Sequence, residues 1–140
     1  PWLSERYGRV VERLLSLPLT VFHGEFYASN VLVRERHDTV RICPVDWEMA
    51  AVGPGLMDVA ALTAGAWSDA ERTSLAMAYH AALPPDGSRP SQEALLTALD
   101  WCRLHLAVRW LGWSPGWSPP PEHAQDWLGE ALRLAEKLDL

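Results

Sequence analysis

HGEFYASNVLV (residues 23–33) and VDWE (residues 45–48) are the two stretches that decide the fold of this chain. They place the carboxylate of Glu25 five positions before the amide of Asn30, and a second carboxylate, Asp46, at the end of a returning strand. We expect Glu25 and Asn30 to flank one cavity that Asp46 enters from the facing strand. Because Mg²⁺ prefers hard oxygen ligands and takes few of them from the protein, this pattern predicts a magnesium site beside phosphate oxygens.

The layout resembles the catalytic and metal loops of the protein-kinase-like superfamily, in which an acid begins the catalytic loop and an Asn follows five positions later. Within that superfamily, the His-Gly-acid and Asp-Trp-Glu motifs are most similar to the aminoglycoside phosphotransferase family, which includes choline-kinase-like enzymes. The resemblance implies ATP and Mg²⁺ as cofactors and a small-molecule hydroxyl as acceptor. It also implies that Glu25 is the catalytic residue and that Asn30 and Asp46 hold the metal and, with it, the nucleotide phosphates.

The resemblance continues through AAVGPGLMDVA (residues 50–60), which is similar to the family's glycine-containing loop followed by an Asp at the start of a helix. It implies that Asp58 braces the catalytic loop by accepting backbone hydrogen bonds. It implies further that His23 is structural and holds the same loop by packing and bonding. Glu48 would orient the metal or the acceptor, or simply face solvent, and the sequence leaves both open. The clear matches run from about Val21 to Leu62.

One residue departs from the family pattern, because Glu25 stands where the family usually has Asp. Glutamate keeps the charge and adds one methylene of reach. Since a catalytic carboxylate must lie within hydrogen-bond distance of the acceptor hydroxyl, we expect the loop or the acceptor to sit slightly further back.

Each of these residues also has a purely structural interpretation. Glu25 can be an ordinary loop carboxylate, Asn30 a turn amide bonded to its own backbone, and Asp46 a cap on the turn after its strand. Two other functions stay open for the whole chain. One is a non-catalytic, pseudokinase-like binding or regulatory protein. The other is a metal-dependent hydrolase, which would need a fuller ligand set, such as additional His ligands.

A kinase of this type also needs a glycine-rich turn over the phosphates and a strand-borne Lys that reaches them. The chain has no G-x-G-x-x-G motif, its only lysine is Lys137, and it begins with Pro1 rather than Met. We therefore expect residues 1–140 to be the C-terminal lobe of a longer protein. The nucleotide-binding N-terminal lobe would be absent, and the lobe by itself would be inactive as a kinase.

The remaining pattern predicts a mainly helical α+β fold, namely the C-terminal lobe of the protein-kinase-like fold with one small β-hairpin. Apolar residues at helical spacing, helped by a Ser68–Glu71 capping box, predict helices over about 2–17, 68–83, 91–112 and from 127 onwards. Short β-rich runs at 31–33 and 40–45, joined by a charged loop at 34–38, predict the hairpin. We expect one domain over residues 1–140, divided into a catalytic loop (21–33), a metal loop (44–58) and a helical acceptor-side subdomain (59–140).

The composition favours a globular protein without a nucleic-acid partner. The chain has 140 residues, of which 49% are hydrophobic, and a formal net charge of −6. A nucleic-acid surface would need clustered basic residues, and a membrane span would need a longer apolar run than any present here. Cys43 and Cys102 have no motif spacing, so we expect reduced core thiols in a cytosolic setting. Three histidines without metal-ligand spacing are interpreted as incidental: His80, His105 and His123.

The chain is rich in tryptophan, with 8 residues of this type. Trp101 and Trp110 lie in a long apolar helix and are expected to pack in the core. Trp113 and Trp117 lie in a Pro/Trp-rich stretch at 113–121. There they would anchor the loop to the helices or stack on an acceptor.

Overall fold

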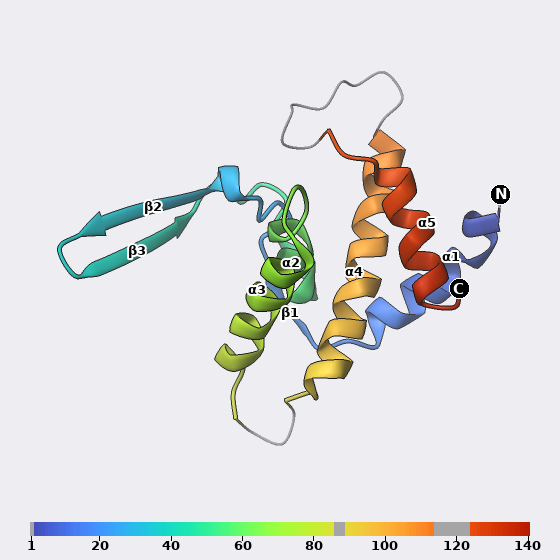
Figure 1. The fold of residues 1–140 in the computed structure, drawn as a ribbon, viewed down its shortest axis with the longest axis horizontal. Helices are drawn as coiled ribbons and strands as arrows, with labels where there is room; N and C mark the ends of the chain where they lie inside the picture. Colours follow the sequence, from blue (N-terminus) through green and yellow to red (C-terminus); the bar gives the residue numbers. More distant parts are fainter. Residues whose placement is uncertain (1, 86–88, 114–123) are drawn as a thin grey trace.

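The computed structural model of the chain describes residues 2–85, 89–113 and 124–140 (Figure 1). In chain order these residues form α1 (Trp2–Leu15), β1 (Leu19–Phe22), the 3-10 helix η1 (Ala28–Asn30), β2 (Val31–Arg36), β3 (Thr39–Pro44), β4 (Ala51–Pro54), α2 (Leu56–Leu62), α3 (Asp69–Ala82), α4 (Gln92–Trp113) and α5 (Trp127–Lys137). The expected mainly helical α+β fold is confirmed. So is the capping box, because the Ser68 hydroxyl accepts from the Glu71 N–H and the Glu71 carboxylate accepts from the Ser68 N–H.

Helix α4 lies at the centre of the helical body and packs against α1, α2, α3 and α5 (Figure 1). A helix that is apolar on more than one face is stable only when other elements cover those faces. The buried residues of α4 are Leu95, Leu99, Asp100, Trp101, Cys102, Leu104, Leu106 and Ala107. The core is therefore built around this one helix. The expected core positions of Trp101 and Cys102 are confirmed, and Trp110 is partly buried against the same core.

Ion pairs add to the apolar contact between α4 and α5. Asp100 of α4 is only 5% exposed, and its carboxylate is paired with Arg103 Nη1 at 3.4 Å and Lys137 Nζ at 2.5 Å. Breaking a buried ion pair leaves an uncompensated charge, so the Asp100–Lys137 pair and the Arg103–Glu130 pair fix how α5 lies along α4. They also occupy Lys137, the only lysine of the chain.

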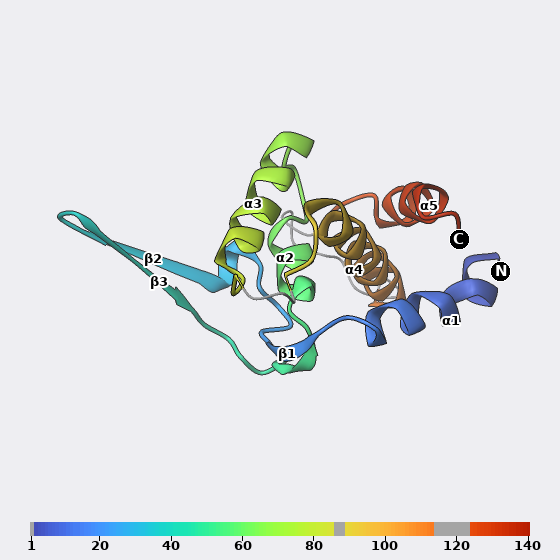
Figure 2. The ribbon, with the colours of Figure 1, turned by 90° about the horizontal axis from the view of Figure 1, so that it is seen from below.

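Two small antiparallel sheets, β1–β4 and β2–β3, complete the described part of the chain. The β2–β3 hairpin extends away from the helices (Figure 2), and most of its residues are exposed. The β1–β4 pair aligns Phe22 with Ala51 and Leu19 with Pro54. This pairing places the start of the 23–33 stretch beside the segment that leads into α2. None of the helices in the described ranges combines the length and the apolar content needed to cross a membrane.

Four expectations about local structure were wrong. Residues 34–36 continue β2 instead of forming a charged loop, because an exposed hairpin accepts charged side chains on either face. Cys43 is exposed and not a core thiol, since its strand stands away from the helices. Residues 51–54 form β4 where a loop was expected, and Trp113 ends α4 instead of opening a loop. The expectations for Trp117 and His123 lie outside the described residues.

A hydrogen bond between Tyr7 of α1 and His105 of α4 joins these two helices. The Tyr7 hydroxyl lies 2.6 Å from Nδ1 of His105, and the two rings stack with centroids 6.1 Å apart. Burial lowers the pKa of His105 below its ordinary value of 6.5, and the nearby Arg109 guanidinium lowers this pKa further. The fold therefore favours the neutral form of His105.

We predict that this histidine makes the fold sensitive to mild acid. Because the unfolded chain protonates His105 more readily, its contribution to stability is fully present above the ordinary pKa and is lost as the pH falls through the lowered folded-state pKa. The free energy of unfolding, measured by urea denaturation between about pH 7 and about pH 5, should therefore fall less steeply for His105→Gln than for the wild type. Equal slopes for the two proteins would contradict this.

Candidate active site

The loop after β1 is held by the carboxylate of Asp58, which lies in the first turn of α2. Its Oδ2 accepts the backbone N–H of His23 at 2.7 Å, and its Oδ1 accepts the backbone N–H of Gly24 at 3.0 Å. Hydrogen bonds to an ionised acceptor are shorter and stronger than neutral ones. One side chain thus ties the start of the 23–33 stretch to the helical body.

The ring of His23 is 1% exposed and bonds to the loop backbone through both of its nitrogens. Nδ1 accepts the N–H of Glu25 at 3.3 Å, and Nε2 lies 2.8 Å from the carbonyl oxygen of Val45. Because Nδ1 accepts, the proton lies on Nε2, which donates to Val45. The ring also packs against Phe26 and Trp47, with centroids 5.7 and 4.5 Å away. Both nitrogens of His23 therefore serve to hold the loop.

Asn30 links the two parts of the loop region. Its side-chain Nδ2 donates to the backbone carbonyl oxygen of Glu25 at 3.0 Å. Its backbone carbonyl oxygen accepts the N–H of Val45 at 2.9 Å. His23, Glu25, Asn30 and Val45 therefore form a closed ring of hydrogen bonds. Since the amide nitrogen faces Glu25, the amide oxygen Oδ1 points away from that bond and makes no hydrogen bond to a described residue.

Asp46 follows Val45 directly, so this ring of hydrogen bonds fixes the backbone beside it. The residue is exposed and its φ is +66°, in the left-handed region. For a residue other than glycine this conformation costs about 1–2 kcal/mol, although Asp tolerates it better than most. Trp47 stabilises the conformation, because its Nε1 donates to the carbonyl of Pro44 at 3.1 Å while its ring packs on His23. Strain of this kind is common at functional sites. Glu48, the next residue, is exposed.

The side chain of Glu25 lines a cavity of about 170 Å³, next to the loop. The other lining residues are Tyr27, Arg109, Trp110 and Trp113. Burial raises the pKa of the Tyr27 phenol above its ordinary value, the Arg109 guanidinium opposes this, and the Glu25 carboxylate adds to it. The charges of Arg109 and Glu25 therefore both act on the Tyr27 hydroxyl. No described residue forms a hydrogen bond or ion pair with the Glu25 carboxylate, which leaves it available within the cavity.

Sequence reasoning did not identify Arg109 as part of this region. Its Nη1 donates to the carbonyl oxygen of Gly24 at 3.3 Å, across 85 positions of sequence. Arg109 lies in the C-terminal part of α4 with no recognisable motif around it, so no local signal could have pointed to the contact.

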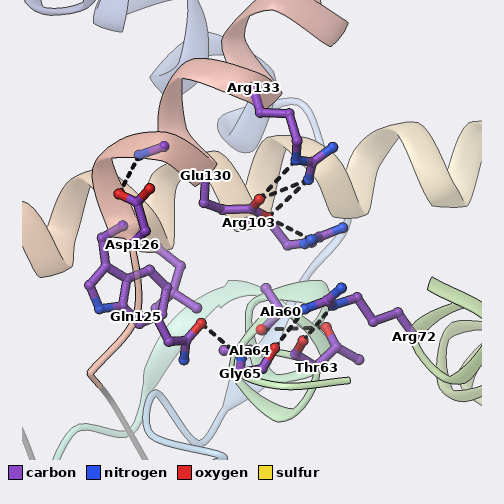
Figure 3. A pocket seen from close by; sticks show the side chains of 13 residues that line it. Ala60, Thr63, Ala64, Gly65, Arg72, Arg103, Gln125, Asp126, Glu130 and Arg133 are labelled. Carbon is purple, nitrogen blue, oxygen red and sulfur yellow. Dashed lines mark hydrogen bonds and ion pairs between the residues drawn. The ribbon is translucent and has the colours of Figure 1, made fainter. Parts of the chain in front are cut away.

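A second, larger cavity of about 290 Å³ lies between the α2–α3 connection and the helices α4 and α5 (Figure 3). Its three arginines already bond to protein groups. Arg72 donates to the carbonyl oxygens of Thr63 and Gly65, while Arg103 and Arg133 both pair with Glu130. Its charges are thus largely satisfied internally, unlike those of the cavity beside Glu25.

The described residues contain no group of three or more His, Cys, Asp or Glu side chains that could hold a metal ion. The site expected from the sequence is of a different kind, since it takes one amide and one carboxylate oxygen, from Asn30 and Asp46. The Val45–Asn30 hydrogen bond places the backbone of Asn30 beside the residue that precedes Asp46. Neither Asn30 nor Asp46 lines the cavity of Glu25, so that cavity is not the one expected to be shared by all three residues.

Comparison with known families gives a match that covers the residues of the loop and of the expected metal site. The sequence model of the phosphotransferase enzyme family matches residues 2–95. The chain belongs to this family. The membership inferred from the two acidic motifs is therefore confirmed, and it assigns a phosphotransferase-type function. No curated protein and no solved structure matched the chain significantly. The family match includes the Asp58, His23 and Asn30 contacts but ends before Arg109.

We predict that alanine substitutions at two glycines change stability in opposite directions. Gly24 has a φ of +86°, and a Cβ there would overlap the carbonyl oxygen of Met49. Gly24→Ala should therefore lower the free energy of unfolding by more than the roughly 1–2 kcal/mol that the left-handed conformation alone costs. Gly8, in α1, has nothing within 4 Å of an added Cβ, so Gly8→Ala should stabilise by about 0.5–1 kcal/mol.

Urea denaturation of the two variants and the wild type measures both changes. The Gly8→Ala protein is the matched control, because it adds the same methyl group to the same chain. A Gly24→Ala protein as stable as the wild type would show that the loop does not need this backbone conformation.

Proposed function

We propose that this chain is the catalytic, acceptor-side lobe of an ATP-dependent phosphotransferase that acts on the hydroxyl of a small molecule. The lobe would be the C-terminal lobe of the protein-kinase-like fold. One observation carries the proposal. A closed ring of hydrogen bonds fixes the backbone at Glu25, Asn30 and Val45, while the side-chain oxygens of Glu25, Asn30 and Asp46 make no bond to described residues.

Each residue has a definite role in this proposal. Glu25 orients or deprotonates the acceptor hydroxyl. Asn30 Oδ1 and the Asp46 carboxylate are hard oxygen donors of the kind that suits Mg²⁺, which usually keeps few protein ligands and completes its shell with water and phosphate oxygens. When bound, the metal would neutralise charge on the phosphates. His23 and Asp58 keep the loop rigid, which matters because phosphoryl transfer depends mostly on positioning and on electrostatic stabilisation.

We propose further that a separate nucleotide-binding lobe of the parent protein holds ATP. The sequence has no G-x-G-x-x-G motif, and its only lysine, Lys137, is paired with Asp100. The chain therefore has no glycine-rich phosphate loop, and its lysine is not available to bind phosphate. The isolated chain would accordingly be inactive as a kinase.

A pseudokinase-like binding protein is the second candidate. Glu25 in place of the usual Asp favours it, whereas the presence of both Asn30 and Asp46 counts against it. A metal-dependent hydrolase is the third, and it would need a fuller ligand set than these two oxygens. Phosphoryl transfer from ATP to a hydroxyl compound, with no phosphate release from that compound, separates the first candidate from both others.

We predict that Mn²⁺ binds between Asn30 and Asp46. In NMR spectra of the chain, Mn²⁺ should selectively broaden the amide signals near both residues, and Asp46→Ala should abolish this. Affinity is expected to be weak because such sites borrow ligands from substrate phosphates. Asp38→Ala is the control, since it removes an exposed carboxylate from the tip of the hairpin. Broadening confined to other exposed carboxylates, and unchanged in Asp46→Ala, would exclude a shared site.

We predict that Asp46→Ala costs more activity than Glu25→Gln in a parent protein that also carries a nucleotide-binding lobe. Losing Asp46 would misplace metal and phosphates together, whereas general-base catalysis typically contributes about 10²–10⁴-fold. Glu25→Asp tests the longer side chain directly. It should either retain activity or show that the pocket has adapted to glutamate. The measurement is the rate of phosphate transfer to a panel of hydroxyl-bearing compounds, and full activity in both Asp46→Ala and Glu25→Gln would remove these residues from the mechanism.

A further inference from the structure

Arg109 is a half-buried cation without an acidic partner among the described residues. Among the described residues, Arg109 makes one hydrogen bond, in which Nη1 donates to the carbonyl oxygen of Gly24. A guanidinium has five N–H donors, and a cation withdrawn from water is stabilised mainly by pairing with an anion. The arginines of the larger cavity, Arg72, Arg103 and Arg133, are paired with carboxylates. Arg109 has no such pair, and it lines the cavity that contains Glu25.

The walls of this cavity are aromatic. Trp110 stacks on Trp127 with ring centroids 5.6 Å apart and planes 10° apart, and it also lies against Tyr27 at 6.0 Å. These contacts hold the wall in place. Trp113 also lines the cavity although it is 59% exposed. An exposed tryptophan that faces a cavity is suited to contact a flat, apolar ligand, because indole gains from stacking as well as from loss of contact with water.

The size of the cavity limits what can enter it. A volume of about 170 Å³ is close to that of a cavity which holds a single benzene-sized ring. Within it, a carboxylate (Glu25) and a guanidinium (Arg109) both act on the Tyr27 hydroxyl between aromatic surfaces. A ligand that satisfies all three features has a hydroxyl for Glu25, a small apolar or aromatic body, and an anionic group for Arg109.

We infer that Arg109 determines acceptor specificity, and that the acceptor is a small hydroxyl compound that carries a carboxylate or a similar anionic group. The inference rests on the proposed function, because it takes Glu25 as the group that receives the hydroxyl. It is opposite to what the net charge of −6 would favour, which is attraction of a cationic acceptor. The guanidinium of Arg109, which has no acidic partner among the described residues, lines the same cavity as Glu25. It outweighs that distant charge, because electrostatic interactions weaken with distance and are screened by salt.

Three matched probes test the charge preference without nucleotide: 3-(hydroxymethyl)benzoate, its neutral amide and the corresponding benzylamine. All three have the same ring and the same hydroxymethyl group, and they differ in the remaining substituent, which is anionic, neutral or cationic. NMR titration of this chain should show the benzoate binding roughly tenfold more tightly than the amide, since a hydrogen bond to a charged group is stronger than one to a neutral group. The benzylamine should bind most weakly. The Arg109 Nε–H signal and the indole N–H signals of Trp110 and Trp113 should shift on binding.

Two variants locate the preference. Arg109→Gln should bring the benzoate and the amide to similar affinity, whereas Arg41→Gln, which removes an exposed arginine from β3, should leave the preference intact. If Arg109→Gln loosens the loop through its lost bond to Gly24, Arg109→Lys keeps the positive charge and should retain part of the preference. The comparison of the three probes on the wild-type chain does not depend on any variant.

The results separate this inference from the proposed function. Equal or tighter binding of the benzylamine on the wild-type chain overturns the role of Arg109, and leaves phosphate transfer at Glu25 untouched. A benzoate preference that survives in Arg109→Gln overturns it as well. A benzoate preference that depends on Arg109, together with no phosphate transfer in the parent protein, would keep the anion site and reject the phosphotransferase proposal.

Discussion

The arrangement of the site depends on the two hydrogen bonds that the Asp58 carboxylate accepts from the backbone of His23 and Gly24. Asp58 lies at the start of α2, and α2 packs on the central helix α4. The carboxylate therefore carries the rigidity of the core to a loop that has no regular structure of its own up to η1. Gly24 is part of the same constraint, since its left-handed backbone brings it close enough to Met49 to leave no room for a side chain.

Beyond the bonds to Asp58, hydrogen bonds between neutral groups fix the rest of the loop. The His23 ring bonds to Glu25 and Val45, and Asn30 bonds to the same two residues. All of these bonds use ring nitrogens, backbone groups or the amide nitrogen of Asn30. The side-chain oxygens of Glu25 and Asn30, which suit a hydroxyl or a metal ion, are left out of the network. Such a division suits the function that we propose, because positioned groups contribute most when no rearrangement is needed at the moment of reaction.

Much of the fold was predictable because its signals are local. Helix positions follow from apolar residues that recur with the helical period, and the start of α3 follows from Ser68 and Glu71 alone. The β1–β4 pair was not predictable, because each strand has only four residues and the pairing joins distant segments. The exposure of Cys43 was missed for a related reason. An alternating apolar strand looks the same in sequence whether it covers a core or stands in solvent, as β3 does here.

The sequence by itself determined the family and the order of the acidic and amide residues, since short motifs in fixed succession need no knowledge of the fold. Tertiary structure alone decided what surrounds them. The proton position on His23 follows from which groups face its two nitrogens. The direction of the Asn30 amide leaves its oxygen without a partner among the described residues. The cavity beside Glu25 follows from the packing of α4 against the loop, which brings Arg109 to Gly24 across 85 positions. Contacts of this kind depend on how helices pack around a core, and no local pattern of residues encodes them.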